Sequence, residues 1–330
     1  MPRFTNVTTA EEVCEALTSR IDGRTFLITG TSARGLGAKC TTALAKHSPA
    51  QLILVSRNKA KVDPVIEEIN SIDAQVDVKF IRCELSDQDC VRKAAEDILN
   101  DASIKHIDVV INNAGIMAVA EYKVDNKGNE LQLSANHIGQ FLLTNLIMPK
   151  IIAAGPGARI VNHTSMGHRL SPFHFDDPKF SEGKESNSAG ADDPWAAYGQ
   201  SKTANILFSV ELARRLEDRH VQAYAVHPGL ILSTGLAGDM DFLKEVPAMV
   251  AAMERNNPGA EWPTDGHVKS DAQGAASALV AALDPELAER SGSYIDDCVV
   301  GKPMAYAIDP DNAKKLWVYS EDVVGQKFDL

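Results

Sequence analysis

The sequence predicts an α/β fold, a doubly wound parallel sheet covered by helices on both faces. Short apolar runs rich in β-branched residues alternate along the chain of 330 residues with longer helix-like segments. This alternation is the order that repeated strand–helix units produce. No Pro/Gly/Ser-rich linker, internal repeat or low-complexity stretch divides the sequence, and single α/β domains often reach this length. We therefore expect one domain.

Seven apolar runs are expected to form the strands of the sheet. They cover residues 24–29, 51–56, 76–82, 107–112, 158–163, 222–227 and 293–296. Runs of this length, bounded by turn residues, are typical of buried strands. The segments between them are long enough to carry the crossover helices.

A glycine-rich turn follows the first of these strands. Residues 30–37 read Gly-Thr-Ser-Ala-Arg-Gly-Leu-Gly and lead into an alanine-rich helical segment. Glycine has no Cβ, so backbone N–H groups in such a turn can approach a pyrophosphate at the helix N-terminus. The spacing differs from the G-x-G-x-x-G of most dinucleotide-binding folds. The candidate phosphate-binding residues are Gly30, Ser32, Arg34, Gly35, Leu36 and Gly37.

Tyr198 and Lys202 lie four residues apart in a helical segment, so both side chains reach one face. A tyrosine has an ordinary pKa of about 10, and lowering it by roughly two units takes about 3 kcal/mol. A lysine ammonium about 4 Å away supplies about 4 kcal/mol at an effective dielectric constant of about 20. Y-x-x-x-K alone is frequent, and an exposed Tyr and Lys on an ordinary helix would explain it. Together with the glycine turn it indicates proton transfer beside a dinucleotide.

These features resemble the classical short-chain dehydrogenase/reductase family. The family turn is T-G-x-x-x-G-x-G, and this chain has one residue more between Gly30 and Gly35. Further matches are an N-N-A-G turn after the fourth strand, a helix asparagine, a strand-end serine and a Pro-Gly turn. They stand at 112–115, Asn136, Ser165 and Pro228-Gly229. The resemblance runs from about Asp22 to the C-terminus. Segments 204–208, 292–295 and 315–320 resemble the retinol dehydrogenase and WW-domain oxidoreductase branch.

The resemblance implies a Rossmann-type fold and hydride transfer between a carbonyl and an alcohol. Tyr198 would exchange the proton, and Ser165 would hold the reacting oxygen. Lys202 would lower the tyrosine pKa and hold the nicotinamide ribose, while Asn136 would link Lys202 to solvent through a water. The other residues implied to bind the cofactor are Glu84, Leu85, Asn113, Ala114, Gly115, Pro228, Gly229 and Ile231. The family usually has aspartate where Glu84 stands.

The resemblance also divides the single domain into four parts. They are an N-terminal extension (1–21), a cofactor-binding and catalytic core (22–229), a substrate-binding segment (230–270) and a C-terminal part with a helix, the last strand and a closing helix (271–330).

The end of the second strand favours NADP(H) over NAD(H). In dinucleotide folds an acidic residue there binds the adenosine ribose and repels a 2′-phosphate. Here the strand ends in Ser56-Arg57-Asn58, without a carboxylate. Ser56 can donate a hydrogen bond to a phosphate and Arg57 can contact it in bidentate fashion. We expect Arg34 to approach the same phosphate from the opposite side.

Composition excludes several other functions. A formal net charge of −12 argues against nucleic acid and anionic membrane surfaces as partners. No stretch approaches about 18 consecutive apolar residues, and the N-terminus lacks a signal-peptide pattern, so we expect a cytoplasmic protein without an integral membrane segment. The five cysteines are scattered, which is typical of reduced thiols. His163, His168 and His174 lack metal-ligand spacing, so no metal is expected.

The substrate is expected to be a hydrophobic carbonyl or alcohol. Leu243, Val246, Val250 and Met253 repeat at helical spacing, joined by Met240, Phe242 and Met249. A methionine-rich apolar segment suits a ligand of irregular shape, such as a retinoid, steroid or polyketide-like ketone, and Met117 is a further candidate for this wall. A polar loop, 181–190, precedes the catalytic helix.

Two other functions stay open at this point. A nucleotide-sugar epimerase or dehydratase also uses Y-x-x-x-K, but it favours T-G-x-x-G-x-x-G, whereas this turn closes as G-x-G. A non-catalytic NADP(H)-sensing protein commonly lacks the tyrosine or the lysine.

A homodimer is also possible, because apolar residues continue along the catalytic helix after Lys202. They are Ile206, Leu207, Val210 and Ala213. Burial within one chain explains the same pattern.

Overall fold

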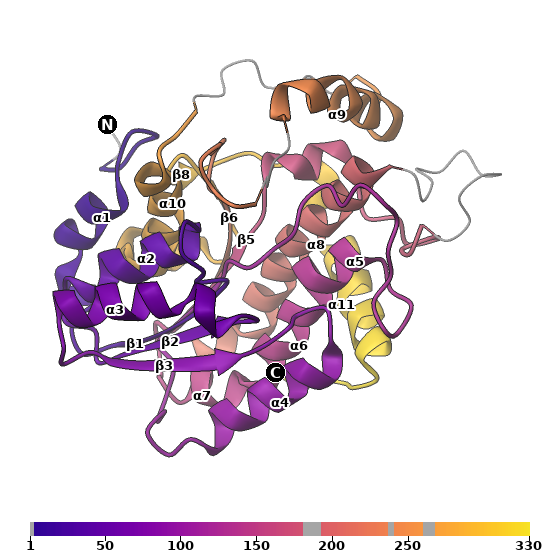
Figure 1. Ribbon diagram of the computed structural model, residues 1–330. Coiled ribbons are helices and arrows are strands. Elements are labelled where there is room, and N and C mark those ends of the chain that lie inside the picture. The colour runs from indigo at the N-terminus through magenta and orange to yellow at the C-terminus, as the bar shows by residue number, and fades with distance from the viewer. Residues whose placement is uncertain (1–2, 181–192, 237–240, 260–267) are drawn as a thin grey trace.

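The computed structural model describes residues 3–180, 193–236, 241–259 and 268–330. Its described part contains a single eight-stranded sheet in the order β3-β2-β1-β4-β5-β6-β7-β8 (Figure 1). The neighbours are parallel, except that β7 and β8 are antiparallel. The strands are β1 Thr25–Thr29, β2 Gln51–Ser56, β3 Asp77–Arg82, β4 Val109–Asn112, β5 Arg159–His163, β6 Gln222–His227, β7 Tyr294–Asp296 and β8 Val299–Val300.

Helices cover both faces of this sheet. They are α1 Ala10–Ala16, α2 Leu36–Ala45, α3 Asp63–Ile72, α4 Gln88–Asn100, α5 Leu131–Leu133, α6 Gly139–Leu146, α7 Met148–Ile152, α8 Pro194–Arg215, α9 Phe242–Asn256, α10 Asp271–Leu283 and α11 Pro310–Val324. Buried side chains of α1, α2, α3 and α10 form one core on the sheet, and those of α4, α6, α7, α8 and α11 form the other. The predicted doubly wound α/β fold is confirmed.

Alternation along the buried strands explains the two cores. Phe26 and Ile28 of β1 belong to one core, whereas Leu27 between them belongs to the other, because successive side chains of a strand point to opposite faces. All seven predicted strands are present, with ends shifted by at most two residues. β8 was missed. Its two residues are exposed, so it has neither the length nor the burial that produces a strand pattern.

The C-terminal helix α11 packs on the catalytic helix α8. Trp317 of α11 is 1% exposed, and its ring lies 5.0 Å from Phe141 and 6.0 Å from Phe208, centroid to centroid. Leu207 lies in the same core. Burial within one chain therefore accounts for Leu207, and a homodimer through α8 stays a prediction. Among the described residues, none of the helices combines the length and the apolar composition that a membrane span requires.

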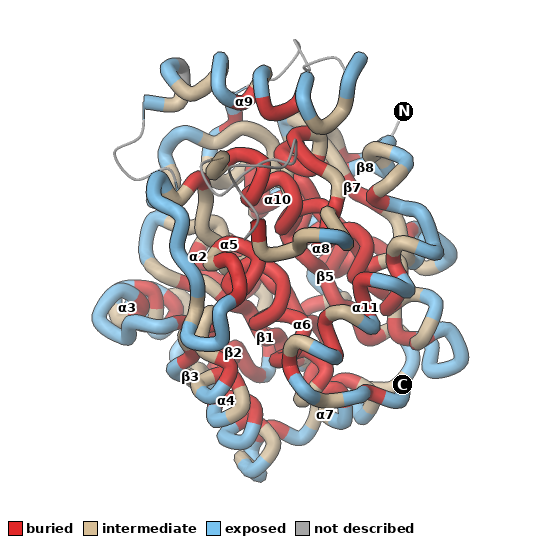
Figure 2. The backbone as a smooth tube through the Cα atoms, turned by 90° about the vertical axis from the view of Figure 1, so that its right-hand side faces the viewer, coloured by how far each residue is buried: buried red, intermediate tan, exposed pale blue. Residues whose placement is uncertain are grey.

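The strand order reverses direction between β1 and β4, since β2 and β3 lie on one side of β1 and β4 to β8 on the other. Ligands of open α/β sheets bind at the carboxyl ends of the strands beside such a reversal. α9 lies beyond this edge, at the periphery of the molecule (Figures 1 and 2). Much of its outer side is exposed, while Met249, Ala252 and Met253 are buried.

Candidate active site

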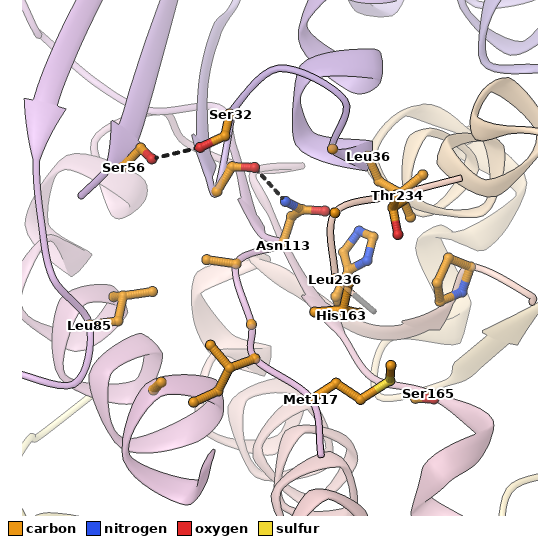
Figure 3. Close-up of a pocket in the computed structure, with 18 of the residues that line it drawn as sticks. Ser32, Leu36, Ser56, Leu85, Asn113, Met117, His163, Ser165, Thr234 and Leu236 are labelled. Carbon is orange, nitrogen blue, oxygen red and sulfur yellow. Dashed lines mark hydrogen bonds between the residues drawn. The ribbon is translucent and has the colours of Figure 1, made fainter. Parts of the chain in front are cut away.

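A cavity of about 1150 Å³ opens at the carboxyl edge of the sheet. Its walls come from the turns that follow β1, β2, β3, β4, β5 and β6, together with parts of α8 and α9 (Figure 3). Ligand pockets commonly measure about 300–1,000 Å³. The volume is therefore sufficient for a large cofactor together with a second small molecule.

The glycine turn packs too tightly for side chains. A Cβ at Gly30, whose φ is +74°, would lie 2.7 Å from the Cα of Ala114, and a Cβ at Gly37 would lie 2.6 Å from the Gly30 carbonyl oxygen. Gly35 and Leu36 line the cavity, so the first turn of α2 faces it. Within the described residues, no side chain caps this helix and its first turn holds no acid. The free N–H groups fit a cofactor pyrophosphate.

Arg34 lies outside the cavity, which corrects one expectation. A hydrogen bond of 3.0 Å from Gly35 N–H to Ser32 O closes the turn, and Arg34 between them has a left-handed φ of +68°. Its exposed side chain lines a separate hollow of about 130 Å³ with Pro64 and Glu68. The additional residue of this turn thus carries the arginine to the outer side, away from the end of β2.

Cationic side chains gather where β2 and β3 end. Ser56 and Arg57 line the cavity there, and their contact with a cofactor phosphate stays a prediction. Sequence reasoning missed three further cations that line the same end: Lys59, Lys61 and Arg82. Arg82 could have been predicted from its position in the sequence. It is the last residue of β3, and β3 pairs directly with β2.

Glu84 and Leu85 also line this end of the cavity. Arg57 Nη1 lies 3.6 Å from Glu84 Oε2, a distance beyond a normal hydrogen bond, and the Arg57 side chain is 66% exposed. Such exposed ion pairs contribute little, so the guanidinium stays available to a ligand. Leu85 is buried and presents an apolar surface.

The N-N-A-G turn after β4 is fixed to the glycine turn after β1. Asn113 donates through Nδ2 to Gly30 O at 3.1 Å (Figure 3) and to Thr29 O at 2.8 Å, and Ala114 N–H donates to Thr29 Oγ1 at 3.0 Å. Asn113, Ala114 and Gly115 line the cavity. Two turns 83 residues apart in sequence are therefore joined by hydrogen bonds into one floor of the cavity.

Ser165, Tyr198 and Lys202 meet in the middle of the cavity. Ser165 lies two residues after the end of β5, while Tyr198 and Lys202 lie one turn apart on α8. Lys202 Nζ lies 5.6 Å from the Tyr198 ring centroid and donates to His163 O at 3.3 Å. Gly167 allows this packing, because a Cβ there would lie 2.6 Å from Tyr198 Cε1. Pro228, Gly229 and Ile231 line the wall opposite, after β6.

Burial dominates the pKa values of this pair. It raises the pKa of Tyr198 to about 12, against a smaller lowering by a hydrogen bond with Ser165. It also lowers the pKa of Lys202 to about 8. The expected lowering of the tyrosine pKa by Lys202 is thus not found. Desolvation of the phenol outweighs every favourable interaction in the protein alone, so at neutral pH the phenol holds its proton and Lys202 its charge.

Asn136 lies in a π-helical turn, residues 134–138, between α5 and α6. Its amide accepts from Ile116 N–H at 2.7 Å and donates to Ile116 O and Ser201 Oγ, both at 2.9 Å. The side chain is fully buried. Asn136 therefore ties the N-N-A-G strand end to α8, next to Lys202. The water link to solvent stays a prediction.

Two histidines that were not predicted for this site line the cavity: His163 at the end of β5 and His227 at the end of β6. Burial lowers the pKa of each to about 3, so both are neutral. His227 Nδ1 accepts from Met166 N–H at 3.2 Å, which fixes the backbone beside Ser165. His168 is buried and structural, since its two ring nitrogens contact Ser165 O and Met304 N–H. Among the described residues, no three side chains are placed to hold a metal.

An apolar chamber extends from Tyr198 toward α9. Trp195, Leu170, Met249 and Met253 are buried in one cluster with Tyr198, and Met117 and Phe242 pack against them. Val246 and Val250 are half-buried. Met240, loop 181–190 and the side chain of Leu243 lie outside the described residues.

The charges of the cavity are segregated. Within the described residues, the charged side chains that line it are Arg57, Lys59, Lys61, Arg82, Glu84, Asp87 and Lys202. All except Lys202 lie at the end of β3 or in the turns after β2 and β3. Among the residues that the structure describes, no charged side chain other than Lys202 lines the half of the cavity beyond Tyr198.

Comparisons with known proteins agree with this geometry. Residues 24–175 match the family model described as short chain dehydrogenase. The chain is 33% identical over 317 residues to retinol dehydrogenase 11 of Homo sapiens, covering 96% of this chain and 90% of that protein. It is 33% identical to a probable oxidoreductase of Streptomyces lividans, covering 92% and 98%. An uncharacterized protein of known structure from Mycobacterium paratuberculosis matches with a TM-score of 0.68 at 29% identity, covering 94% and 96%.

Proposed function

The chain belongs to the short-chain dehydrogenase family, in its retinol dehydrogenase-like branch, and we propose that it is an NADP(H)-dependent ketoreductase or alcohol dehydrogenase. Its substrate is an apolar small molecule with a carbonyl or alcohol group. The observation that carries the proposal is the division of one cavity into a cationic end and an apolar end, with Ser165, Tyr198 and Lys202 between them.

The cationic end supports NADP(H) as the cofactor. β2 ends in Ser56 and Arg57 rather than in a carboxylate, and Lys59, Lys61 and Arg82 line the same end of the cavity. Such a cluster favours an additional phosphate on the adenosine ribose. The uncapped N-terminus of α2 would hold the pyrophosphate.

Bound nicotinamide cofactor supplies or takes up the hydride, and the residues of the chain manage the charge that this leaves on oxygen. In reduction, Tyr198 donates its proton to the oxygen, and Ser165 holds that oxygen by a hydrogen bond. With a pKa of about 12 the phenol is protonated at neutral pH. Lys202, with a pKa of about 8, is mainly charged there and stabilises the phenolate that forms.

The chamber beyond Tyr198 supports an uncharged, hydrophobic substrate. Burying an unpaired charge there would be costly, whereas Met117, Trp195, Phe242 and Met249 offer apolar and polarisable contacts. Retinoid, steroid and polyketide-like ketones meet this requirement. The name of the human relative, retinol dehydrogenase 11, is consistent with a ligand of this kind.

The test is NADPH oxidation, measured by absorbance, across a panel of hydrophobic ketones and small charged keto acids. We expect turnover of hydrophobic ketones, preference for NADPH over NADH, and loss of at least about 100-fold in kcat for Tyr198→Phe. Tyr122→Phe changes an exposed tyrosine and serves as the matched control. Equal rates for Tyr198→Phe and the parent protein would support a cofactor-sensing role, and preference for charged keto acids would refute the substrate class.

A further inference from the structure

α9 is anchored to the body of the fold mainly at its C-terminal end. Arg255 forms an ion pair with Asp193, the N-cap residue of α8. Asn256 Nδ2 donates to Leu170 O at 3.1 Å, and Asn257, which follows the helix, donates to Arg169 O at 2.5 Å. These contacts hold the second half of α9 against the turn that follows Ser165.

The first half of α9, residues 242–246, is held differently. Trp195 Nε1 donates to Glu245 Oε2 at 2.9 Å. Among the described residues, this is the one hydrogen bond or ion pair that joins residues 242–246 to a residue beyond the helix and its N-cap. A carboxylate acceptor makes it a strong hydrogen bond.

Pro247 separates the two halves. It stands inside α9, and proline has no N–H to donate to the carbonyl four residues earlier. The helix therefore lacks one bond of its ladder between the anchored second half and the first half. A missing bond of this kind is a common site of helix bending.

Trp195 links the first half of α9 to the reacting group. Its ring is 2% exposed and stands edge-on to Tyr198, at 6.2 Å between centroids, and to Phe242, at 6.4 Å. Phe242 and Met249 line the cavity. A movement of residues 242–246 away from Trp195 would therefore open the apolar chamber directly above Tyr198.

We propose that Glu245 is a positioning residue that holds the first half of α9 closed over the substrate chamber through its hydrogen bond to Trp195, with Pro247 as the hinge. This inference rests on the proposed function for its link to catalysis. Glu245 thus helps to retain the substrate, whereas Tyr198 transfers the proton.

The experiment compares Glu245→Leu, which removes the acceptor, with Glu245→Gln, which keeps an amide oxygen. Glu254→Leu changes an exposed residue of the same helix and is the control. Loss of a hydrogen bond to a charged group weakens binding by about tenfold or more. We expect Glu245→Leu to raise KM for a hydrophobic ketone about tenfold, to leave kcat within about twofold and to leave the NADPH Kd unchanged. In Glu245→Gln, KM should be close to that of the parent protein.

Amide hydrogen exchange of residues 242–249 provides a second readout that needs neither cofactor nor substrate. We expect faster exchange in Glu245→Leu than in the parent protein and in Glu254→Leu. Equal exchange in the two leucine variants, or faster exchange without a change in KM, would overturn the proposal. If the parent protein reduces no ketone, the proposed function fails, while the exchange comparison still decides whether Glu245 holds α9.

Discussion

Replacing Lys202 by methionine should stabilise the protein at neutral pH while abolishing its activity. Lys202 is 4% exposed, and burial lowers its pKa from 10.5 to about 8. A lysine whose folded-state pKa is lowered costs stability below that pKa, because the unfolded chain binds the proton more strongly. For these two values the cost is about 3 kcal/mol at pH 7. Methionine has a similar shape and no charge, so it avoids this cost.

The stability gain of Lys202→Met should become smaller as the pH rises. Between pH 8 and 10.5 the native lysine releases its proton while the unfolded one retains it, so the parent protein gains stability as pH rises. At pH 9.5 the remaining cost is about 1 kcal/mol, so the advantage of the variant should shrink by about 2 kcal/mol from pH 7. The lost cation–π contact with Tyr198, 5.6 Å away, offsets about 1 kcal/mol of the gain.

Urea unfolding of Lys202→Met and the parent protein at pH 7.0 and 9.5 measures this difference. His163 O, which accepts from Lys202, keeps a hydrogen bond of 2.8 Å from Asn205 Nδ2, so the substitution leaves that acceptor satisfied. Lys314→Met changes an exposed lysine and controls for the loss of a surface charge. If the variant were less stable than the parent protein at pH 7, or if the difference did not vary with pH, burial of the Lys202 charge would not be what costs stability.

Three other substitutions test separate parts of the account. Arg57→Ala should raise the NADPH Kd about tenfold, by about 1.4 kcal/mol, and leave the NADH Kd unchanged; an equal loss for both cofactors would contradict the assignment of the 2′-phosphate. Gly167→Ala places a Cβ 2.6 Å from Tyr198 Cε1 and should lower kcat at least about tenfold in a kinetic assay; a kcat equal to that of the parent protein would contradict the packing argument. Trp317→Ala should destabilise the protein by about 3–5 kcal/mol, measured by denaturant unfolding; a loss below about 1 kcal/mol would show that α11 contributes little to the core.

The sequence predicts those features of the site that depend on local pattern. Gly30 and Gly37 are identifiable because close backbone packing excludes any side chain there. Ser165 and Asn113 are identifiable because each follows a short apolar strand whose carboxyl end must face the site. The strands are predicted well for the same reason, since burial on both faces leaves a continuous apolar run.

Features that depend on the path of the chain in space are not predictable in this way. The position of Arg34 depends on a left-handed residue in a turn of unusual length, and spacing alone does not reveal the direction of its side chain. The bond between Trp195 and Glu245 joins residues 50 positions apart. The raised pKa of Tyr198 follows from its burial, which Y-x-x-x-K does not encode.

Hydride transfer from NADPH to the carbonyl carbon is tested directly by following a deuterium label from NADPH into the product. NADPH deuterated at the transferable position of C4 is mixed with a hydrophobic ketone and the enzyme in ordinary water, and the alcohol is analysed by mass spectrometry. We expect one deuterium on the carbinol carbon, and product formation that is lost in Tyr198→Phe. An alcohol without deuterium, or one labelled at carbon when the solvent rather than NADPH is deuterated, would contradict hydride transfer from NADPH.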